Sequence, residues 1–294
     1  MWAHVVGLAA FLASGDSAQC HTVAVAPGED LTVASYGTGS PVVLVPGLFG
    51  AAYGFRKLIP LLSAHGHRIV VIEPLGVGTS ARPERSDYSL GAQAARLAAV
   101  LDTLGLSRTV LVAHSLGAAM AFRLAYLRPD LVRGIVSLEG GPAETAATPG
   151  LRRAAQWVPW VKTLGGVRLI RGKIRAALIK ASGDTSWVDD DVVEAYTAGA
   201  ARDLDGTLKA YLRMAESHER ERLAPHLAEI RCPVRLVVGG APHPESLPER
   251  EIVRLQTSLP QLRVDTIGGA GHHLHEERAD AVAAIVEQVA AEAP

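Results

Sequence analysis

One serine stands in a setting that can activate it as a nucleophile. Ser115 follows the apolar run Val110 to Ala113 and precedes an apolar helical pattern from Leu116 to Leu127. Such a strand-to-helix turn exposes the hydroxyl near a helix N-terminus, where amide groups favour negative charge. Small residues two positions to either side make this a G-x-S-x-G elbow with Ala in the first position. The alternative is an ordinary turn in which the serine only caps the helix.

A serine hydroxyl needs a positioned base, and His272 is the candidate. It ends the glycine-rich segment Gly269 to His272, from which a side chain can reach back over the edge of a sheet. The neighbouring His273 and His275 create an H-H-x-H cluster that also suits a metal. No carboxylate or cysteine group with matching spacing accompanies it, so we expect no metal and no cofactor, and we expect His273 and His275 to face a cap or begin a helix.

Two glutamates compete for the role of the acid that orients the base. Glu139 directly follows the apolar run Ile135 to Leu138, and an ionisable group ending a buried strand is costly unless it has a partner. Glu245 lies in the loop after the run Val234 to Val238. The sequence favours Glu139, with Glu245, another acid or a serine–histidine dyad as alternatives.

The elements that hold these residues alternate along the chain. Short β-branched runs predict strands of a mostly parallel sheet covered by helices on both faces, at Val42–Val45, Ile69–Ile72, Val110–Ala113, Ile135–Leu138, Val234–Val238 and Val264–Ile267. Apolar spacing from Leu90 to Leu104 predicts a helix that begins after Ser89 and stops at Gly105. Thr22–Ala26 and Leu31–Tyr36 predict an antiparallel hairpin at the sheet edge.

The alternation breaks in the middle of the chain. We predict an α/β core over residues 20–142 and 223–294, and a helical cap over residues 143–222, since an insertion of this length is not a simple loop. A second domain unrelated to the site is the alternative.

Several segments resemble the α/β-hydrolase superfamily in order and spacing. Val45 to Gly50 resembles its oxyanion loop, with Pro46 where His usually stands. Glu73 to Ser80 resembles its D-x-x-G-x-G-x-S turn, with Glu in place of Asp, and Gly269 to His272 resembles its G-x-G-H segment. The resemblance implies an α/β-hydrolase fold and an oxyanion hole formed by the N–H groups of Leu48 and Leu116. Most relatives carry the acid in a G-x-x-D turn after the later strand, and this chain has no Asp there; Glu139 matches the haloalkane-dehalogenase-like placement instead.

A serine at the elbow favours an acyl-enzyme over the aspartate chemistry of haloalkane dehalogenases and epoxide hydrolases. We therefore predict a carboxylic ester hydrolase of the esterase or lipase type that acts on a small-molecule ester. Rival functions are lactone, amide or carbon–carbon bond hydrolysis, perhydrolysis, or a ligand-binding receptor on the same scaffold. Core packing is the alternative for each of the side chains we assign to substrate binding, which are Phe49, His114, Trp157 and Trp160.

Composition narrows the partners. With 294 residues, 29 Lys plus Arg and 30 Asp plus Glu, the chain has a net charge of -1 and no basic field for nucleic acid. Residues 1–19 resemble a secretory signal, favouring a secreted or periplasmic protein; a packed or frayed N-terminal segment, or a lipid-modified Cys20, is the alternative. The segment Leu151 to Ser182 has eight basic residues and no acidic one, which suits either a solvated cap face or a lid that touches a membrane surface.

Overall fold

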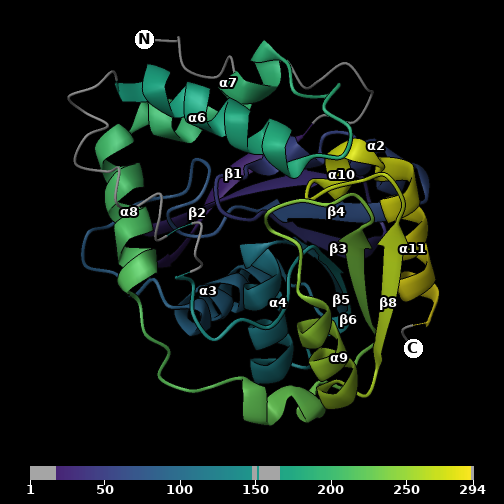
Figure 1. Cartoon of the computed structure of the whole chain (residues 1–294). Coiled ribbons are helices and arrows are strands. Elements are labelled where there is room, and N and C mark those ends of the chain that lie inside the picture. Colours follow the sequence, from purple (N-terminus) through teal and green to yellow (C-terminus); the bar gives the residue numbers. More distant parts are fainter. Residues whose placement is uncertain (1–17, 148–150, 152–165, 293–294) are drawn as a thin grey trace.

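The computed structural model describes residues 18–147, 151 and 166–292, and an eight-stranded sheet forms its centre (Figure 1). The strands are β1 (Gln19–Ala26), β2 (Glu29–Tyr36), β3 (Ser40–Val45), β4 (His67–Ile72), β5 (Thr109–His114), β6 (Val132–Leu138), β7 (Val234–Gly239) and β8 (Leu262–Ile267). They stand in the order β1-β2-β4-β3-β5-β6-β7-β8. β1, β2 and β4 pair antiparallel, and β3 to β8 run parallel. The predicted mostly parallel sheet and its edge hairpin are confirmed.

Helices cover both faces of the sheet, as predicted. One face packs on α2 (Leu58–Ala64), α10 (Leu274–Glu277) and α11 (Ala279–Glu292), and on the short 3-10 helix η1 (Ala52–Phe55). The other packs on α3 (Leu90–Thr103), α4 (Leu116–Leu127) and α9 (Glu249–Ser258), and on η2 (Ala224–Glu229). Successive strand residues point to opposite faces, so Leu44 joins the first layer while Val43 and Val45 join the second.

The ends of α3 show how local sequence sets the elements. Ser89 Oγ accepts the Ala92 amide at 3.2 Å and caps the helix. Leu90, Leu97 and Leu101 are buried against the core along one helical face. The chain leaves the helix through Gly105, whose φ of +62° suits glycine. The predicted start and stop of this helix are confirmed.

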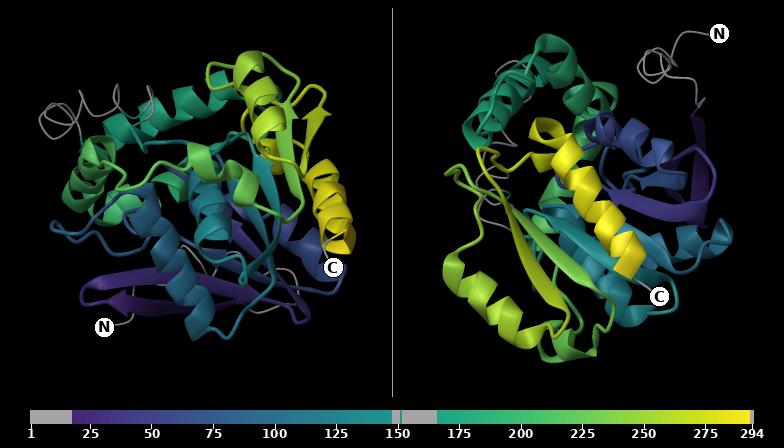
Figure 2. Two further views of the ribbon diagram at one scale, coloured as in Figure 1. Left: turned by 90° about the horizontal axis from the view of Figure 1, so that it is seen from below. Right: turned by 90° about the vertical axis from the view of Figure 1, so that its right-hand side faces the viewer.

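Between β6 and β7 the chain forms a helical insertion of α6 (Gly166–Ala181), α7 (Asp190–Arg202) and α8 (Leu204–Glu216). These helices lie at one end of the sheet, above and beside the strand ends, while α11 runs along its side (Figures 1 and 2). Their apolar side chains form a separate small core of Ile174, Leu178, Trp187, Val192 and Val193. All three helices fall within the predicted cap, residues 143–222, whose boundaries stay a prediction.

The ends of the chain add little to this picture. Residues 1–17 of the signal-like segment lie outside the described residues. Within the described ranges, no helix combines the length and the apolarity that crossing a membrane requires.

Candidate active site

Ser115 occupies the turn from β5 into α4, where the sequence predicts a sharp change of direction. Its φ of 51° and ψ of -118° lie outside the usual regions for a residue with a side chain. The Ser115 amide donates to the Leu138 carbonyl of β6 at 2.9 Å, which pins the turn to the neighbouring strand. The strained turn thus projects a serine from the carboxyl end of a central strand.

Glycines let the loop after β3 approach this turn closely. A Cβ on Gly117 would lie 2.7 Å from the carbonyl oxygens of Val45 and Pro46. A Cβ on Gly47 would lie 2.9 Å from the His114 carbonyl oxygen. Both separations are shorter than real Cβ contacts, so the backbone requires glycine at both positions.

The amides of Leu48 and Leu116 flank the serine from these two segments. Leu48 lies in a turn closed by the Gly50 amide donating to the Gly47 carbonyl at 3.0 Å, and Leu116 is the first residue of α4. Among the described residues, no hydrogen bond has the amide of Leu48 or of Leu116 as its donor. An oxyanion hole needs such unpaired donors, and the assignment of these two amides to it stays a prediction.

Glu139 follows β6 at the strand end next to Ser115. Its φ is 51° and the residue is 4% exposed. The Gly239 amide of β7 donates to Glu139 Oε1. A Cβ on the next residue, Gly140, would lie 2.4 Å from the Ser115 carbonyl oxygen, so the two turns are packed against each other.

His272 lies on the loop after β8 and contacts both candidate acids. Its Nδ1 is 3.9 Å from Glu139 Oε2, which is close but longer than a hydrogen bond. Its Nε2 is 3.0 Å from Glu245 Oε2, a carboxylate with 53% of its side chain exposed. In a serine–histidine–acid triad the acid faces Nδ1 and the serine faces Nε2. Glu139 therefore stands on the side of the ring that the acid needs, and Glu245 stands where the serine hydroxyl must bind.

His114 is buried against His272 and the loop that carries it. The residue is 6% exposed, and its Nε2 lies 3.0 Å from the His272 carbonyl oxygen. Its ring also contacts those of His272 and His275, with centroids 4.6 Å apart in each pair. The contact supports the loop that carries His272; the role of His114 in substrate binding stays a prediction.

Among the described residues, two groups of side chains have possible ligand atoms within 4.8 Å of one another, as a metal site would: His114, His273 and His275, and Glu139, His243 and His272. The first group includes no carboxylate, and burial, followed by the charges of His272, Arg56 and Lys57, lowers the pKa of His275 to about 3. Burial is also the main reason that the pKa values of His114 and His273 lie well below their usual range. A cation would add charge to an already repulsive environment, so we interpret the first group as packed neutral imidazoles.

Two glutamates that the sequence did not single out as site residues tie the His272 loop to the insertion. Glu277 accepts the amides of Gly183 and Asp184 at 2.8 Å and that of Gly271 at 3.1 Å. Glu276 accepts from Tyr196 of α7 at 3.0 Å. In the sequence, only their position just after the histidine cluster could have drawn attention to them.

Buried Glu73 plays a similar linking role next to the predicted oxyanion loop. It accepts the amide of Ala52 at 2.9 Å and that of Thr79 at 2.6 Å, and Ser80 Oγ donates to its carbonyl at 2.6 Å. The glutamate in place of the expected aspartate therefore joins its own turn to η1.

The insertion brings aromatic material over the oxyanion loop. Phe49 meets Tyr211 of α8 edge to face, with centroids 4.8 Å apart, and also packs on the apolar core of the insertion. Trp157 and Trp160 lie outside the described residues.

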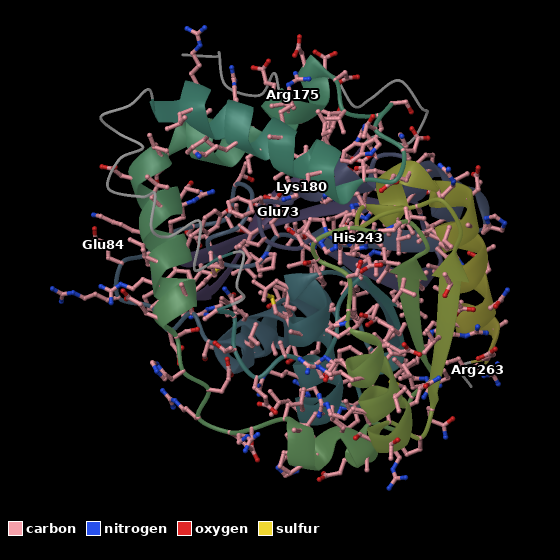
Figure 3. The ribbon with its side chains drawn as sticks, in the orientation of Figure 1. Glu73, Glu84, Arg175, Lys180, His243 and Arg263 are labelled. Carbon is pink, nitrogen blue, oxygen red and sulfur yellow. The ribbon has the colours of Figure 1, made fainter. Side chains whose placement is uncertain are left out.

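In the basic segment, Arg171 lies 3.3 Å from Glu194, and Arg175, labelled on the insertion in Figure 3, pairs with Asp190. Such pairs favour the interpretation of a solvated outer face.

Comparisons with known proteins agree with this architecture. The family described as alpha/beta hydrolase fold matches residues 40–163, which include the serine turn. The mouse protein "sn-1-specific diacylglycerol lipase ABHD11" is 27% identical over 246 residues, covering 81% of this chain and 76% of the relative. The Pseudomonas putida protein "2-hydroxy-6-oxo-2,4-heptadienoate hydrolase" is 26% identical over 272 residues, covering 89% of this chain and 93% of the relative.

Among solved structures, "Epoxide hydrolase CorEH without ligand" superposes with a TM-score of 0.79 at 19% identity, covering 94% of this chain and 99% of that one. This likeness concerns the fold. The chain therefore has the α/β-hydrolase fold, and the matched segment with its serine turn is similar to that family.

Proposed function

We propose that this α/β hydrolase cleaves carboxylic esters through an acyl-enzyme formed on Ser115. The observation that carries the proposal is the strained serine turn, with two unengaged amides beside it. Ester hydrolysis builds negative charge on a carbonyl oxygen, and each preorganised donor is worth about 10²–10³ in rate. The similarity to a protein named as a diacylglycerol lipase supports an ester substrate.

In the proposed reaction, Ser115 Oγ attacks the ester carbonyl while His272 Nε2 takes the hydroxyl proton. The amides of Leu48 and Leu116 hold the oxyanion. The tetrahedral intermediate then expels the alcohol, which receives the proton from His272. A water molecule, activated by the same nitrogen, attacks the acyl-enzyme and releases the acid. Glu139 faces Nδ1 and stabilises the imidazolium in both steps.

This sequence of steps requires Glu245 to leave His272 Nε2. The two atoms are 3.0 Å apart here, and the serine hydroxyl must take the place of that carboxylate. Glu245 is on an exposed loop, so its side chain can turn into solvent without disturbing a buried contact. Glu245 is then a bystander in the chemistry, whereas Glu139 takes part in it.

The test is hydrolysis of p-nitrophenyl esters of increasing acyl length by the wild type and by Ser115→Ala. We expect turnover by the wild type and a loss of about 10⁴-fold or more in kcat for the variant. A wild type that hydrolyses none of the esters contradicts the proposal and favours the receptor or a narrow-specificity enzyme.

Carbon–carbon bond hydrolysis is a second candidate, because the relative named as 2-hydroxy-6-oxo-2,4-heptadienoate hydrolase aligns over 89% of this chain. Assaying the wild type with 2-hydroxy-6-oxo-2,4-heptadienoate beside the esters separates the two activities. Contact of the basic segment with membranes stays a separate proposal; binding to anionic vesicles that falls steeply with salt supports it, and no binding refutes it.

A further inference from the structure

A second histidine lies against the proposed acid. His243, in the loop after β7, has its Nε2 3.4 Å from Glu139 Oε1, and both side chains are almost completely buried, with 0% and 1% exposed. The other carboxylate oxygen, Oε2, faces His272 Nδ1 at 3.9 Å. Figure 3 shows His243 beneath the insertion, near the upper end of the sheet. Glu139 is thus placed between two histidines, with one oxygen toward each.

The buried carboxylate needs donors, and its surroundings provide few. The Gly239 amide donates to Oε1, and the ion-pair partners found among the described residues are His243 and His272. Neither ring nitrogen of His243 has a hydrogen-bond partner there, so the 3.4 Å contact with Oε1 is the nearest polar contact the ring makes to Glu139 but is longer than a good hydrogen bond. A ring with a proton on Nε2 complements Oε1, whereas a ring without one would set a lone pair against the carboxylate.

The backbone holds His243 in this place. Prolines at 242 and 244 restrict the chain on either side of it. The amide of Ala241 donates to the Ala270 carbonyl at 2.9 Å, which ties this loop to the one that carries the base. The rings of His243 and His272 are 5.6 Å apart between centroids. The two loops therefore hold both rings around the same carboxylate.

We propose that His243 is a positioning residue: its Nε2–H holds Oε1 of Glu139 and so directs Oε2 toward Nδ1 of His272. The inference rests on the proposed triad. A donor on Oε1 fixes the orientation of the carboxylate, so that Oε2 faces Nδ1 of His272. Without that donor, Glu139 can turn away from Nδ1, and the imidazolium formed during each step loses its partner.

Steady-state kinetics with p-nitrophenyl butyrate tests the proposal. Glutamine can place its side-chain NH₂ near the position of the imidazole Nε2–H, and leucine offers no donor. We expect His243→Leu to lower kcat about 10- to 100-fold with KM within about 2-fold, as for a lost hydrogen bond to a charged group. We expect His243→Gln to stay within about 5-fold of the wild type. His226→Gln is the matched control, because His226 also contacts a carboxylate, that of Glu229 at 2.7 Å, far from the site.

A double-mutant cycle shows whether His243 acts through Glu139. In a Glu139→Gln background, His243→Leu should cause no further loss of kcat, since the carboxylate to be oriented is gone. An equal loss in both backgrounds overturns the proposal. So does a His243→Leu enzyme with wild-type kcat, provided that the wild type turns over and Ser115→Ala does not.

Nuclear magnetic resonance of protein labelled with ¹⁵N-histidine reports which ring nitrogen of His243 carries a proton. This measurement does not depend on catalytic activity. We expect the His243 ring, assigned through His243→Gln, to carry its proton on Nε2 near neutral pH. A proton on Nδ1 alone overturns the proposal, even if esters prove not to be substrates.

Discussion

The buried histidines predict that the fold loses stability in mild acid. Burial, followed by the charges of His272, Arg56 and Lys57, lowers the pKa of His275 to about 3. In the unfolded chain its pKa returns to about 6.5. Between these values the unfolded chain binds more protons than the folded one. The stability is therefore complete above about pH 6.5 and is lost as the pH falls.

The size of the effect follows from these two values. At pH 5, protonation of His275 in the unfolded chain alone costs the fold about 2 kcal/mol. His114 and His273, whose pKa values burial also lowers, add to the loss in the same direction. A histidine that binds a proton only in the unfolded chain contributes a slope of up to about 1.4 kcal/mol per pH unit, so even one such group removes a noticeable part of the stability of an ordinary domain.

The assay is urea unfolding at several pH values between 7.5 and 5. In His275→Phe, whose new ring would lie beside Phe55, the slope of stability against pH should fall by about one proton, or about 1.4 kcal/mol per pH unit. His21→Gln, at an exposed position, should leave the slope unchanged. A His275→Phe slope equal to that of the wild type would show that this histidine is not held neutral by its surroundings, and the reasoning would be wrong.

Three further predictions concern the site and its surroundings. Glu139→Gln should lower kcat roughly 10³- to 10⁴-fold, while Glu245→Gln should stay within about 3-fold; kinetics in which only the second is impaired would reverse the assignment. Gly140→Ala forces a Cβ to 2.4 Å from the Ser115 carbonyl oxygen and should lower the free energy of unfolding by about 1–3 kcal/mol, measured by urea denaturation; an unchanged midpoint contradicts the packing argument. Burial raises the pKa of Cys232 to about 11, so at pH 8 about 0.1% is thiolate and iodoacetamide should modify it far more slowly in folded than in urea-unfolded protein, as mass spectrometry can show; equal rates would contradict its burial.

Local sequence predicted the framework well, because the framework depends on local signals. β-branched runs marked the parallel strands, and the Ser89 cap marked the start of α3. The serine turn was predictable because a strand, small residues and a helix follow one another without interruption around Ser115. The glycines before His272 marked its loop in the same way.

The surroundings of the acid were less predictable, since they depend on contacts between distant loops. The sequence favoured Glu139 over Glu245, and the structure sets them on opposite nitrogens of His272. The ring of His243 is buried against Glu139, a contact between loops that are far apart in the sequence. One signal was present: with Gly240, His243 forms a G-x-x-H spacing where a G-x-x-D turn was sought.

The carboxylate of Glu277 has a mechanical consequence for substrate entry. It binds amides on both the end of α6 and the His272 loop, and the His272 amide donates to the Ala181 carbonyl at 2.7 Å. We therefore expect the carboxyl end of α6 and the His272 loop to move together. A bulky substrate that lifted the insertion at this end would carry the base away from the serine. We therefore expect a bulky substrate to displace the insertion at its opposite side, around α8 and the aromatic contact between Phe49 and Tyr211.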